Sequence, residues 1–488
     1  MKTKIAIIGA GFSGLAAAAY LANQGMQVTV FEKNALPGGR AGKIEENGFS
    51  FDKGPSWYWM PDVFDRFFEQ FNIKTSEYYE LEKLNPSYRV YFGLNDFIDV
   101  PSDITELKKL FESIEPGSSA KLEIFLHNAK QKYDLGMKKL IYKPSLSVWE
   151  YMEPWILKAL FSLDISRSVS SYIRSLFTNP RLIQILEFPV LFLGATPQKL
   201  PALYTLMNYA DLVLGSWYPK GGMYAVVQGF YNLAIDQGAN FKFNSSVTKI
   251  EVVENEATGL WCNNEFISFD FVLGTADYHH IEKDLLPSKY QSYSDKYWNS
   301  RVLSPSALLF YIGVNKKLDI LHHNLLFDKD FKNHADQIYN NPVWPDDPSI
   351  YISCASKTDL HSAPENCENL VVLIPVAPGL TDGPETRDKY FKLVLDRLQS
   401  VTGIDIRNNI TYLKSYANDD FITEYNSFKG NAYGLANTLK QTAIFKPSIK
   451  SKKVKNLFYA GQLTTPGPGV PPCIVSGQVA ATEILKRI

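Results

Sequence analysis

The chain begins with a short apolar run that leads directly into a glycine-rich turn. Residues 4–8 predict a buried strand, and Gly9, Gly11 and Gly14 follow at the spacing GxGxxG, with Ser13 inside the turn. The first glycine of such a turn permits the tight bend, and the second lets the backbone approach a pyrophosphate. The third allows the next helix to pack close to the strand. The pattern therefore predicts a dinucleotide site near the start of the chain.

A helix, a second strand and an acidic residue complete the unit. We expect the helix over residues 12–24, ending before Gly25, because glycine is favoured just beyond a helix C-terminus. Residues 27–31 predict the strand, which ends at Glu32. In such units the acid binds ribose hydroxyls and the helix N-terminus faces the phosphates. The complete unit is much more specific than its glycines alone.

A further glycine turn bears on the choice of dinucleotide. Gly38, Gly39 and Arg40 follow the acid and would supply backbone donors and a bidentate cation beside the pyrophosphate. Nicotinamide sites rarely continue in this way, whereas a larger cofactor that stays bound needs such contacts. The turn therefore favours a larger, permanently bound dinucleotide over a nicotinamide.

Charge and residue usage exclude several kinds of partner. The 488 residues carry 50 Lys and Arg against 51 Asp and Glu, and a net charge of −1 provides no basic field for nucleic acid. The four cysteines form no CxxC pair, and four of the seven histidines form adjacent pairs whose side chains diverge. We therefore expect neither a dithiol centre nor a metal.

We expect a cytoplasmic protein. The first apolar run, residues 5–8, is too short for a signal peptide. The longest nearly uncharged stretch, residues 200–219, contains proline, asparagine, aspartate and glycine, and is a poor candidate for a spanning helix.

Helix and strand patterns divide the chain into two interleaved parts. Residues 224–237 predict a helix, and strands follow over 240–243, 247–253, 257–261 and 266–269. They lead to the run 271–277, which predicts a buried strand that ends in a turn, and Val247 is a candidate cofactor contact. A mostly helical stretch, 81–219, and a mixed one, about 300–437, interrupt this part. We assign 1–80, 221–290 and 438–488 to a cofactor domain, and 81–220 with 291–437 to a substrate domain.

A glycine- and proline-rich turn precedes the last helix. A buried strand near residues 456–460 leads to Gly461 and Gln462, and the turn then runs to Gly469 and Val470. Pro471 suits the first helical turn, where its missing N–H costs nothing. This helix N-terminus would direct positive dipole and free N–H groups at the group in front of it. Against the N1/C2=O edge of a flavin, it would stabilise the reduced ring.

Along its whole length the chain resembles the bacterial-type phytoene desaturases, the carotenoid desaturase family of the FAD-containing amine oxidase superfamily. The matching motifs are the GxGxxG unit with its acid, the GGR turn, Gly54-Pro55-Ser56 and the closing TxPGxGVP. The resemblance implies an α/β fold, with a Rossmann-like FAD-binding domain of the amine oxidase/carotenoid desaturase type and a discontinuous α+β substrate domain. It also implies that the segment from Gly54 to Ser56 approaches the flavin. Many relatives have Gly-Asp where this chain has Gly461-Gln462, so we expect only a backbone contact at Gln462.

The same resemblance implies a reaction. Two hydrogens leave a C–C bond of a long polyisoprenoid, FAD accepts a hydride, and oxygen or a quinone reoxidises the cofactor. We expect phytoene as substrate and lycopene or a related carotene as product. Binding would come from burying apolar surface, at about 25 cal/mol per Å². The sequence assigns no side chain as proton acceptor.

Three alternatives share parts of the pattern. Carotenoid isomerases and saturases also resemble the chain. An amine or porphyrinogen oxidase has the same fold and cofactor, but the PGxGVP closure argues against it. A prenyl-chain carrier of the GDP-dissociation-inhibitor type keeps the fold without flavin, and Glu32 with the GGR turn argues against that role.

We expect the protein to work on a membrane surface without spanning the bilayer, because a C40 hydrocarbon substrate dissolves only in lipid. Residues 151–217 supply the expected face. Its apolar members are Trp155, Leu160, Phe161, Leu176, Phe177 and Trp217, and its cations are Lys158, Arg167, Arg174 and Arg181.

Overall fold

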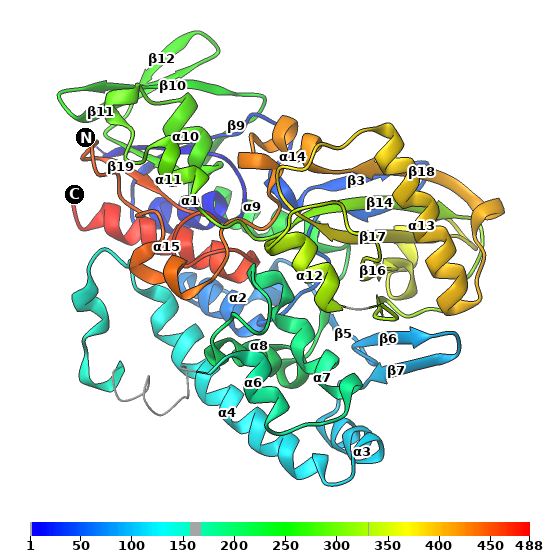
Figure 1. Ribbon diagram of the computed structural model, residues 1–488. Coiled ribbons are helices and arrows are strands. Elements are labelled where there is room, and N and C mark those ends of the chain that lie inside the picture. Colours follow the sequence, from blue (N-terminus) through cyan, green and yellow to red (C-terminus); the bar gives the residue numbers. More distant parts are fainter. Residues whose placement is uncertain (1, 157–166, 330) are drawn as a thin grey trace.

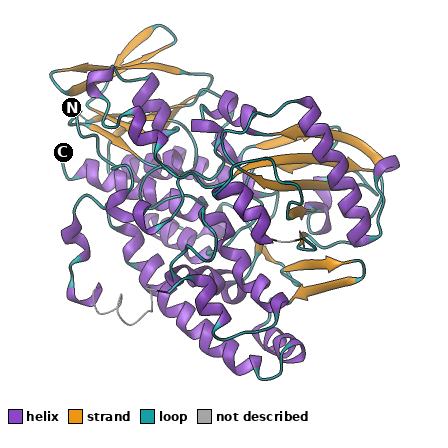
Figure 2. Ribbon diagram, viewed as in Figure 1, coloured by secondary structure: helices purple, strands orange, loops and turns teal. Residues whose placement is uncertain are grey.

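Two large sheets organise the chain, and helices cover them (Figures 1 and 2). The structure is a computed structural model that describes residues 2–156, 167–329 and 331–488. The first sheet is parallel, with the order β19-β13-β1-β2-β9. Its strands are β1 (Lys4–Ile8), β2 (Gln27–Phe31), β9 (Asn240–Lys242), β13 (Phe271–Gly274) and β19 (Leu457–Tyr459).

Both faces of this sheet are covered, which explains why β1 is apolar throughout its buried part. Ile5 and Ile7 pack with the helices α1 (Phe12–Asn23), α9 (Met223–Asp236) and α15 (Val470–Leu485). Ala6 and Ile8 point the other way, into a core shared with the strands β10 (Val247–Val253) and β11 (Glu256–Cys262). β12 (Glu265–Ser268) pairs with β11, and α10 (Tyr278–Asp284) and α11 (Asp295–Asn299) follow. The predicted helices and strands of this part are confirmed within one or two residues.

The second sheet is mixed, with the order β18-β14-β17-β16-β15-β6-β7. All its pairings are antiparallel except that of β15 with β6. One face packs on α13 (Pro384–Thr402), and the other faces the helical region. The strands are β6 (Tyr88–Gly93), β7 (Asp96–Val100), β14 (Ser306–Val314), β15 (His323–Leu326), β16 (Ile350–Ser353), β17 (Glu368–Val376) and β18 (Ile410–Tyr416).

The stretch 81–219 contains strands as well as helices. β5 (Leu81–Lys83) pairs with β8 (Trp217–Pro219), so the chain enters and leaves this stretch side by side. β6 and β7, which the helical pattern did not predict, form an edge hairpin of the second sheet. The helices are α3 (Ile104–Ile114), α4 (Ser118–Lys138), α6 (Val169–Arg174), α7 (Pro180–Glu187) and α8 (Leu206–Tyr209).

Shorter elements link these layers. They are β3 (Lys43–Glu46), β4 (Phe49–Asp52), α2 (Pro61–Phe68), α12 (Phe331–Tyr339) and α14 (Asn418–Tyr425). In the part of the chain that the structure describes, no helix has the length and apolarity needed to cross a bilayer.

The structure changes the expected membrane face. The prediction that Phe177 belongs to an exposed face is wrong, because Phe177 is fully buried and packs edge-on against Phe111 and Phe125. Leu176, Trp155 and Trp217 are half-buried. Arg174 and Arg181 form ion pairs, and Arg167 donates a hydrogen bond to the backbone of Ser171. Lys158, Leu160 and Phe161 lie outside the described residues.

The helices α1 and α15 approach each other closely enough to give a stability prediction. A Cβ on Gly477 would lie 2.2 Å from the backbone oxygen of Ser13, so Gly477→Ala must separate the two helices. We expect a loss of roughly 1 to 3 kcal/mol in the free energy of unfolding, from overpacking. Urea denaturation followed by circular dichroism measures this loss.

Gly383→Ala is the matched control, because a Cβ there meets nothing within 4 Å. Equal stability of the two variants would contradict the helix packing described here.

Candidate functional site

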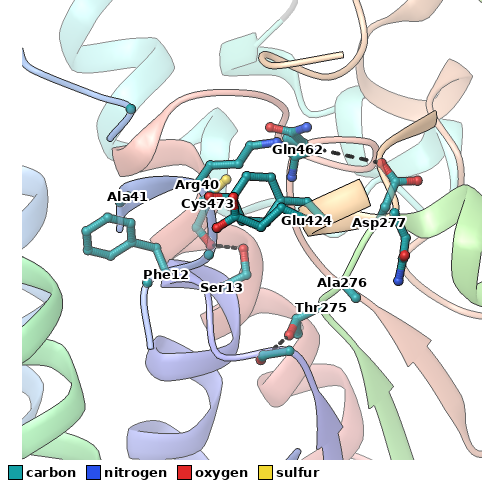
Figure 3. Close-up of a pocket in the computed structure, with 18 of the residues that line it drawn as sticks. Phe12, Ser13, Arg40, Ala41, Thr275, Ala276, Asp277, Glu424, Gln462 and Cys473 are labelled. Atoms are coloured by element: carbon teal, nitrogen blue, oxygen red, sulfur yellow. Dashed lines mark hydrogen bonds and ion pairs between the residues drawn. The ribbon is translucent and has the colours of Figure 1, made fainter. Parts of the chain in front are cut away.

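A cavity opens where the carboxyl ends of β1, β2 and β13 face the second sheet (Figure 3). Its volume is about 260 Å³, measured as the space open to the centres of water molecules. Ligands of open parallel sheets bind at this edge. All but two of the predicted cofactor residues line it: Gly9, Gly11, Ser13, Glu32, Gly38, Gly39, Arg40, Gly54, Pro55, Val247, Gly461, Gln462, Gly469 and Val470.

The two exceptions, Gly14 and Ser56, lie next to the cavity without lining it. A Cβ on Gly14 would lie 2.1 Å from the backbone oxygen of Gly9, which is the close helix packing expected of the third glycine. Ser56 is buried, and its hydroxyl lies near that of Tyr351 on the second sheet. The motif therefore directs Ser56 toward the second sheet.

Glu32 is placed to accept hydrogen bonds from a ribose. The carboxylate is buried, Oε2 accepts a hydrogen bond from the N–H of Ala10 at 2.8 Å, and Oε1 accepts one from Asn34 at 2.9 Å. Burial raises the pKa of Glu32, and these backbone donors act against that shift. Since a carboxylate offers about four lone-pair sites, two remain for hydroxyl donors.

Two helix N-termini meet at the cavity. α1 begins at Phe12, directly after Gly11, and α15 begins at Val470. The hydroxyl of Ser13 donates to the backbone oxygen of Cys473 at 2.9 Å and ties the two ends together (Figure 3). Both helices direct partial positive charge at the same space, which favours an anionic ligand.

Arg40 lies inside the cavity beside the loop that follows α14. Its Nη2 donates to Ser427 Oγ at 2.8 Å and lies 3.8 Å from Asp277 Oδ2. With the amide oxygen of Gln462 turned toward Arg40, this oxygen accepts a hydrogen bond from the same nitrogen at 3.1 Å and holds the guanidinium in place (Figure 3). Nε of Arg40 is buried without a hydrogen-bond partner.

Sequence reasoning missed the contribution of α14, which it assigned to the substrate domain. Glu424, Tyr425 and Asn426 line the cavity, with Tyr433 further along the chain. Lys53 forms an ion pair with Glu424, and Lys33 donates to the backbone oxygen of Thr423 at 3.0 Å. No motif marks α14. One signal in the sequence could have indicated it. Lys33 and Lys53 lie next to cofactor motifs, and each needs a hydrogen-bond acceptor from another part of the chain.

These residues fit FAD. The cradle is open at Gly11, where a Cβ would meet nothing within 4 Å, and Arg40 has a buried donor to offer. We propose that Glu32 holds the ribose, that the turns at Gly11 and Gly39 with Arg40 hold the pyrophosphate, and that the start of α15 faces the flavin. Bound FAD would supply a two-electron hydride acceptor.

Comparison with known proteins decides the family. Residues 12–485 match the family described as flavin containing amine oxidoreductase. The chain belongs to this family. An oxidoreductase from Methanosarcina mazei has the same fold, with a TM-score of 0.64 and 15% identity over 99% of this chain and 100% of the other.

The flavoprotein also has relatives among carotenoid desaturases, which places it in that group. It is 39% identical to carotenoid 3,4-desaturase of Haloarcula japonica, over 99% of this chain and 98% of the other. It is 33% identical to 4,4'-diapophytoene desaturase of Staphylococcus haemolyticus, over 99% of both chains. It is 31% identical to zeta-carotene-forming phytoene desaturase of Myxococcus xanthus, over 99% of this chain and 94% of the other. The protein is an FAD-dependent oxidoreductase that acts on CH–CH bonds.

Replacement of Glu32 tests the ribose contact. Glu32→Ala removes the acceptor for ribose hydroxyls and leaves the N–H groups of Ala10 and Asn34 without their partner. Hydrogen bonds to charged groups contribute about 1.5 to 3 kcal/mol each, so we expect FAD to bind at least roughly tenfold more weakly. Titration of apoprotein with FAD, followed by flavin fluorescence, measures the affinity.

Glu45→Ala is the control, because the side chain of Glu45 is 59% exposed and pairs only with Lys43. Wild-type affinity in Glu32→Ala would show that this carboxylate does not hold the ribose.

Proposed function

We propose that the protein desaturates a long acyclic polyisoprenoid, introducing C=C bonds stepwise into phytoene to give lycopene or a related carotene. The observation that carries this proposal is a second cavity, adjacent to the cofactor cavity and almost wholly apolar. Leu373 and Tyr433 line both cavities. The second is walled by side chains such as Phe188, Leu325, Phe327, Phe331, Ile338 and Pro375. A hydrocarbon with almost no hydrogen-bonding group requires walls of this kind.

The second sheet supports the same proposal because it forms a common floor. Leu309 pairs with Leu373, and Leu373 pairs with Tyr351 on the next strand. Residues opposite each other in antiparallel strands share one face of the sheet. Leu309 lines the cofactor cavity, Tyr351 lines the apolar one, and Leu373 joins them. A chain lying along this row would pass close to the cofactor.

The level of 39% identity to a 3,4-desaturase favours a second candidate. The protein would then desaturate an end of an already conjugated carotenoid. Oxygen or a quinone is our proposed electron acceptor in either case. The division into a cofactor domain and a substrate domain is also a proposal, which the side-by-side entry and exit strands β5 and β8 support.

Expression in bacteria that make defined carotenes separates these candidates. In a host that accumulates phytoene, we expect red lycopene or a partly desaturated carotene, identified by chromatography and absorption spectra. In a host that accumulates lycopene, a further red shift would identify the 3,4-desaturase. If FAD-containing protein left both carotenes unchanged, the proposed function would be wrong. Purified protein without flavin would instead favour the prenyl-chain carrier.

We also propose that the protein docks on a membrane surface, through a segment that overlaps only the first two residues of the one expected from the sequence. Leu146, Val148, Trp149 and Met152 are all exposed, and Trp149 is 75% exposed. This segment, residues 146–152, follows α4 at the outer edge of the molecule in Figure 1. Of the three nearby lysines, Lys138 pairs with Asp134 and Lys143 with Glu153. Lys139, whose ammonium lies 4.7 Å from the centroid of the Trp155 ring, would contribute about 1 kcal/mol next to anionic lipid.

Liposome flotation tests the docking surface. Wild type should float with anionic vesicles, and Trp149→Glu combined with Met152→Glu should float several-fold less, because charge is costly to insert among lipid chains. FAD content should not change. Leu360→Glu is the control, since Leu360 is 76% exposed outside this segment. Wild type that stayed soluble while desaturating carotene in liposomes would contradict the docking proposal.

A further inference from the structure

We propose that Tyr351, supported by His323, accepts the proton that the substrate loses during desaturation. The assignment rests on the proposed function and adds the step that neither motif nor family comparison assigns to a residue. The Tyr351 hydroxyl lies 2.8 Å from Nδ1 of His323, and both side chains are buried. Tyr351 lines the apolar cavity, so it would touch the substrate, and His323 would act through it.

The position of Tyr351 follows from the register of the second sheet. It lies one strand beyond Leu373, which lines both cavities. Neighbouring strands are about 4.8 Å apart, so Tyr351 stands one strand spacing from the wall of the cofactor cavity. His323 pairs with Ser353 on the same face, diagonal to Tyr351. The pair is therefore close to the place where substrate and cofactor meet.

The surroundings of His323 keep it neutral and available. Trp57 stacks on its ring, with centroids 3.9 Å apart and planes within 18°. Burial holds the pKa of His323 well below its usual range, and the neighbouring His322 acts in the same direction. Within the part of the chain that the structure describes, Nε2 of His323 is buried and has no hydrogen-bond partner. When the Tyr351 hydroxyl donates this hydrogen bond, the lone pair of Nδ1 faces Tyr351 and Nε2 carries the ring proton.

Two other titratable groups that line the apolar cavity, His334 and Tyr339, are already engaged in hydrogen bonds. His334 uses both ring nitrogens, Nε2 with the backbone oxygen of Pro375 at 2.8 Å and Nδ1 with the N–H of Ser349 at 3.1 Å. Tyr339 donates to the backbone oxygen of Leu191. Burial lowers the pKa of Lys446 to about 7, but Lys446 lines neither cavity. A proton passed to any of these would break an existing contact or lack a path.

The step balances without a further reactant. Desaturation breaks C–H bonds on two neighbouring carbons, and one hydrogen leaves with its electron pair as hydride, with FAD as the oxidant. The other hydrogen leaves as a proton to the Tyr351 oxygen, and its electron pair becomes the second bond of the new C=C. The Tyr351 hydroxyl proton moves to Nδ1 of His323. A C–H bond next to an allylic cation is strongly acidic. A weakly basic imidazole is therefore sufficient to take up the proton through Tyr351.

Tyr351→Phe tests the assignment because it removes the hydroxyl and keeps the ring. With a carotene that wild type desaturates, we expect kcat to fall roughly 100-fold or more and KM to stay within about twofold. Deuterium on the carbon that loses the proton should slow the variant several-fold more than wild type, because proton loss then limits the rate. The FAD content of the purified variant should not change. Its affinity for carotene, measured by quenching of tryptophan fluorescence, should not change either.

Two further variants distinguish chemistry from structure. Tyr390→Phe is the matched control, because Tyr390 is buried on the opposite, α13 side of the second sheet and uses its hydroxyl on the backbone oxygen of Pro345, and it should keep wild-type rates and isotope effects. His323→Phe keeps a ring to stack on Trp57 and removes Nδ1, so it should show the isotope signature of Tyr351→Phe. The double variant should be no slower than Tyr351→Phe, since the two residues act as one unit.

Each outcome bears on the assignment. Unimpaired kcat in Tyr351→Phe, or a raised KM with wild-type kcat, would overturn it and leave the proposed function intact. Wild type that holds FAD yet desaturates no carotene would overturn the proposed function and this assignment together.

Discussion

The contact between α1 and α15 determines the geometry of the whole site. Because Gly477 has no Cβ, the backbone of Ser13 can lie against it, and the Ser13 hydroxyl bonds to Cys473 one turn away. The two helix N-termini then converge on one space from opposite ends of the sequence. Each carries about half a positive charge, and together with Arg40 they would offset much of the negative charge of a pyrophosphate and of a reduced flavin. A larger residue at this contact would separate the two donors.

The second sheet provides an apolar surface beneath both cavities. It also carries the Tyr351 hydroxyl at a position that the strand register fixes. Its strands are buried on both faces, so alternate residues serve different purposes. Leu308 and Phe310 pack toward α13, while Leu309 faces the cofactor cavity. Tyr351 follows on the same face as Leu309, backed by His323. The register of backbone hydrogen bonds thus sets the distance from cofactor to tyrosine.

The cofactor cavity is closed by a segment that belongs, by sequence, to neither cofactor motif. α14 brings Glu424 to Lys53 and the backbone of Thr423 to Lys33, and the loop after it brings Ser427 to Arg40. Each of these cations belongs to a cofactor motif or is the neighbour of one, so residues in and beside the motifs hold the closing segment through long side chains. Partial burial strengthens these pairs relative to surface ion pairs.

The sequence by itself determined the parts of the molecule whose conformation depends on near neighbours. The strand, turn and helix around Gly9 and Gly14, the acid at Glu32 and the start of α15 all follow from local sterics and helix capping. Contacts between distant segments were decided only by the tertiary structure. The apolar run at residues 370–375 indicates a strand, but not that Leu373 pairs with Tyr351. Apolar composition likewise marks Phe177 and Trp149 alike, although packing buries one and leaves the other exposed. The reason is physical: propensity acts within a few residues, whereas register and burial are set by which surfaces the whole chain brings together.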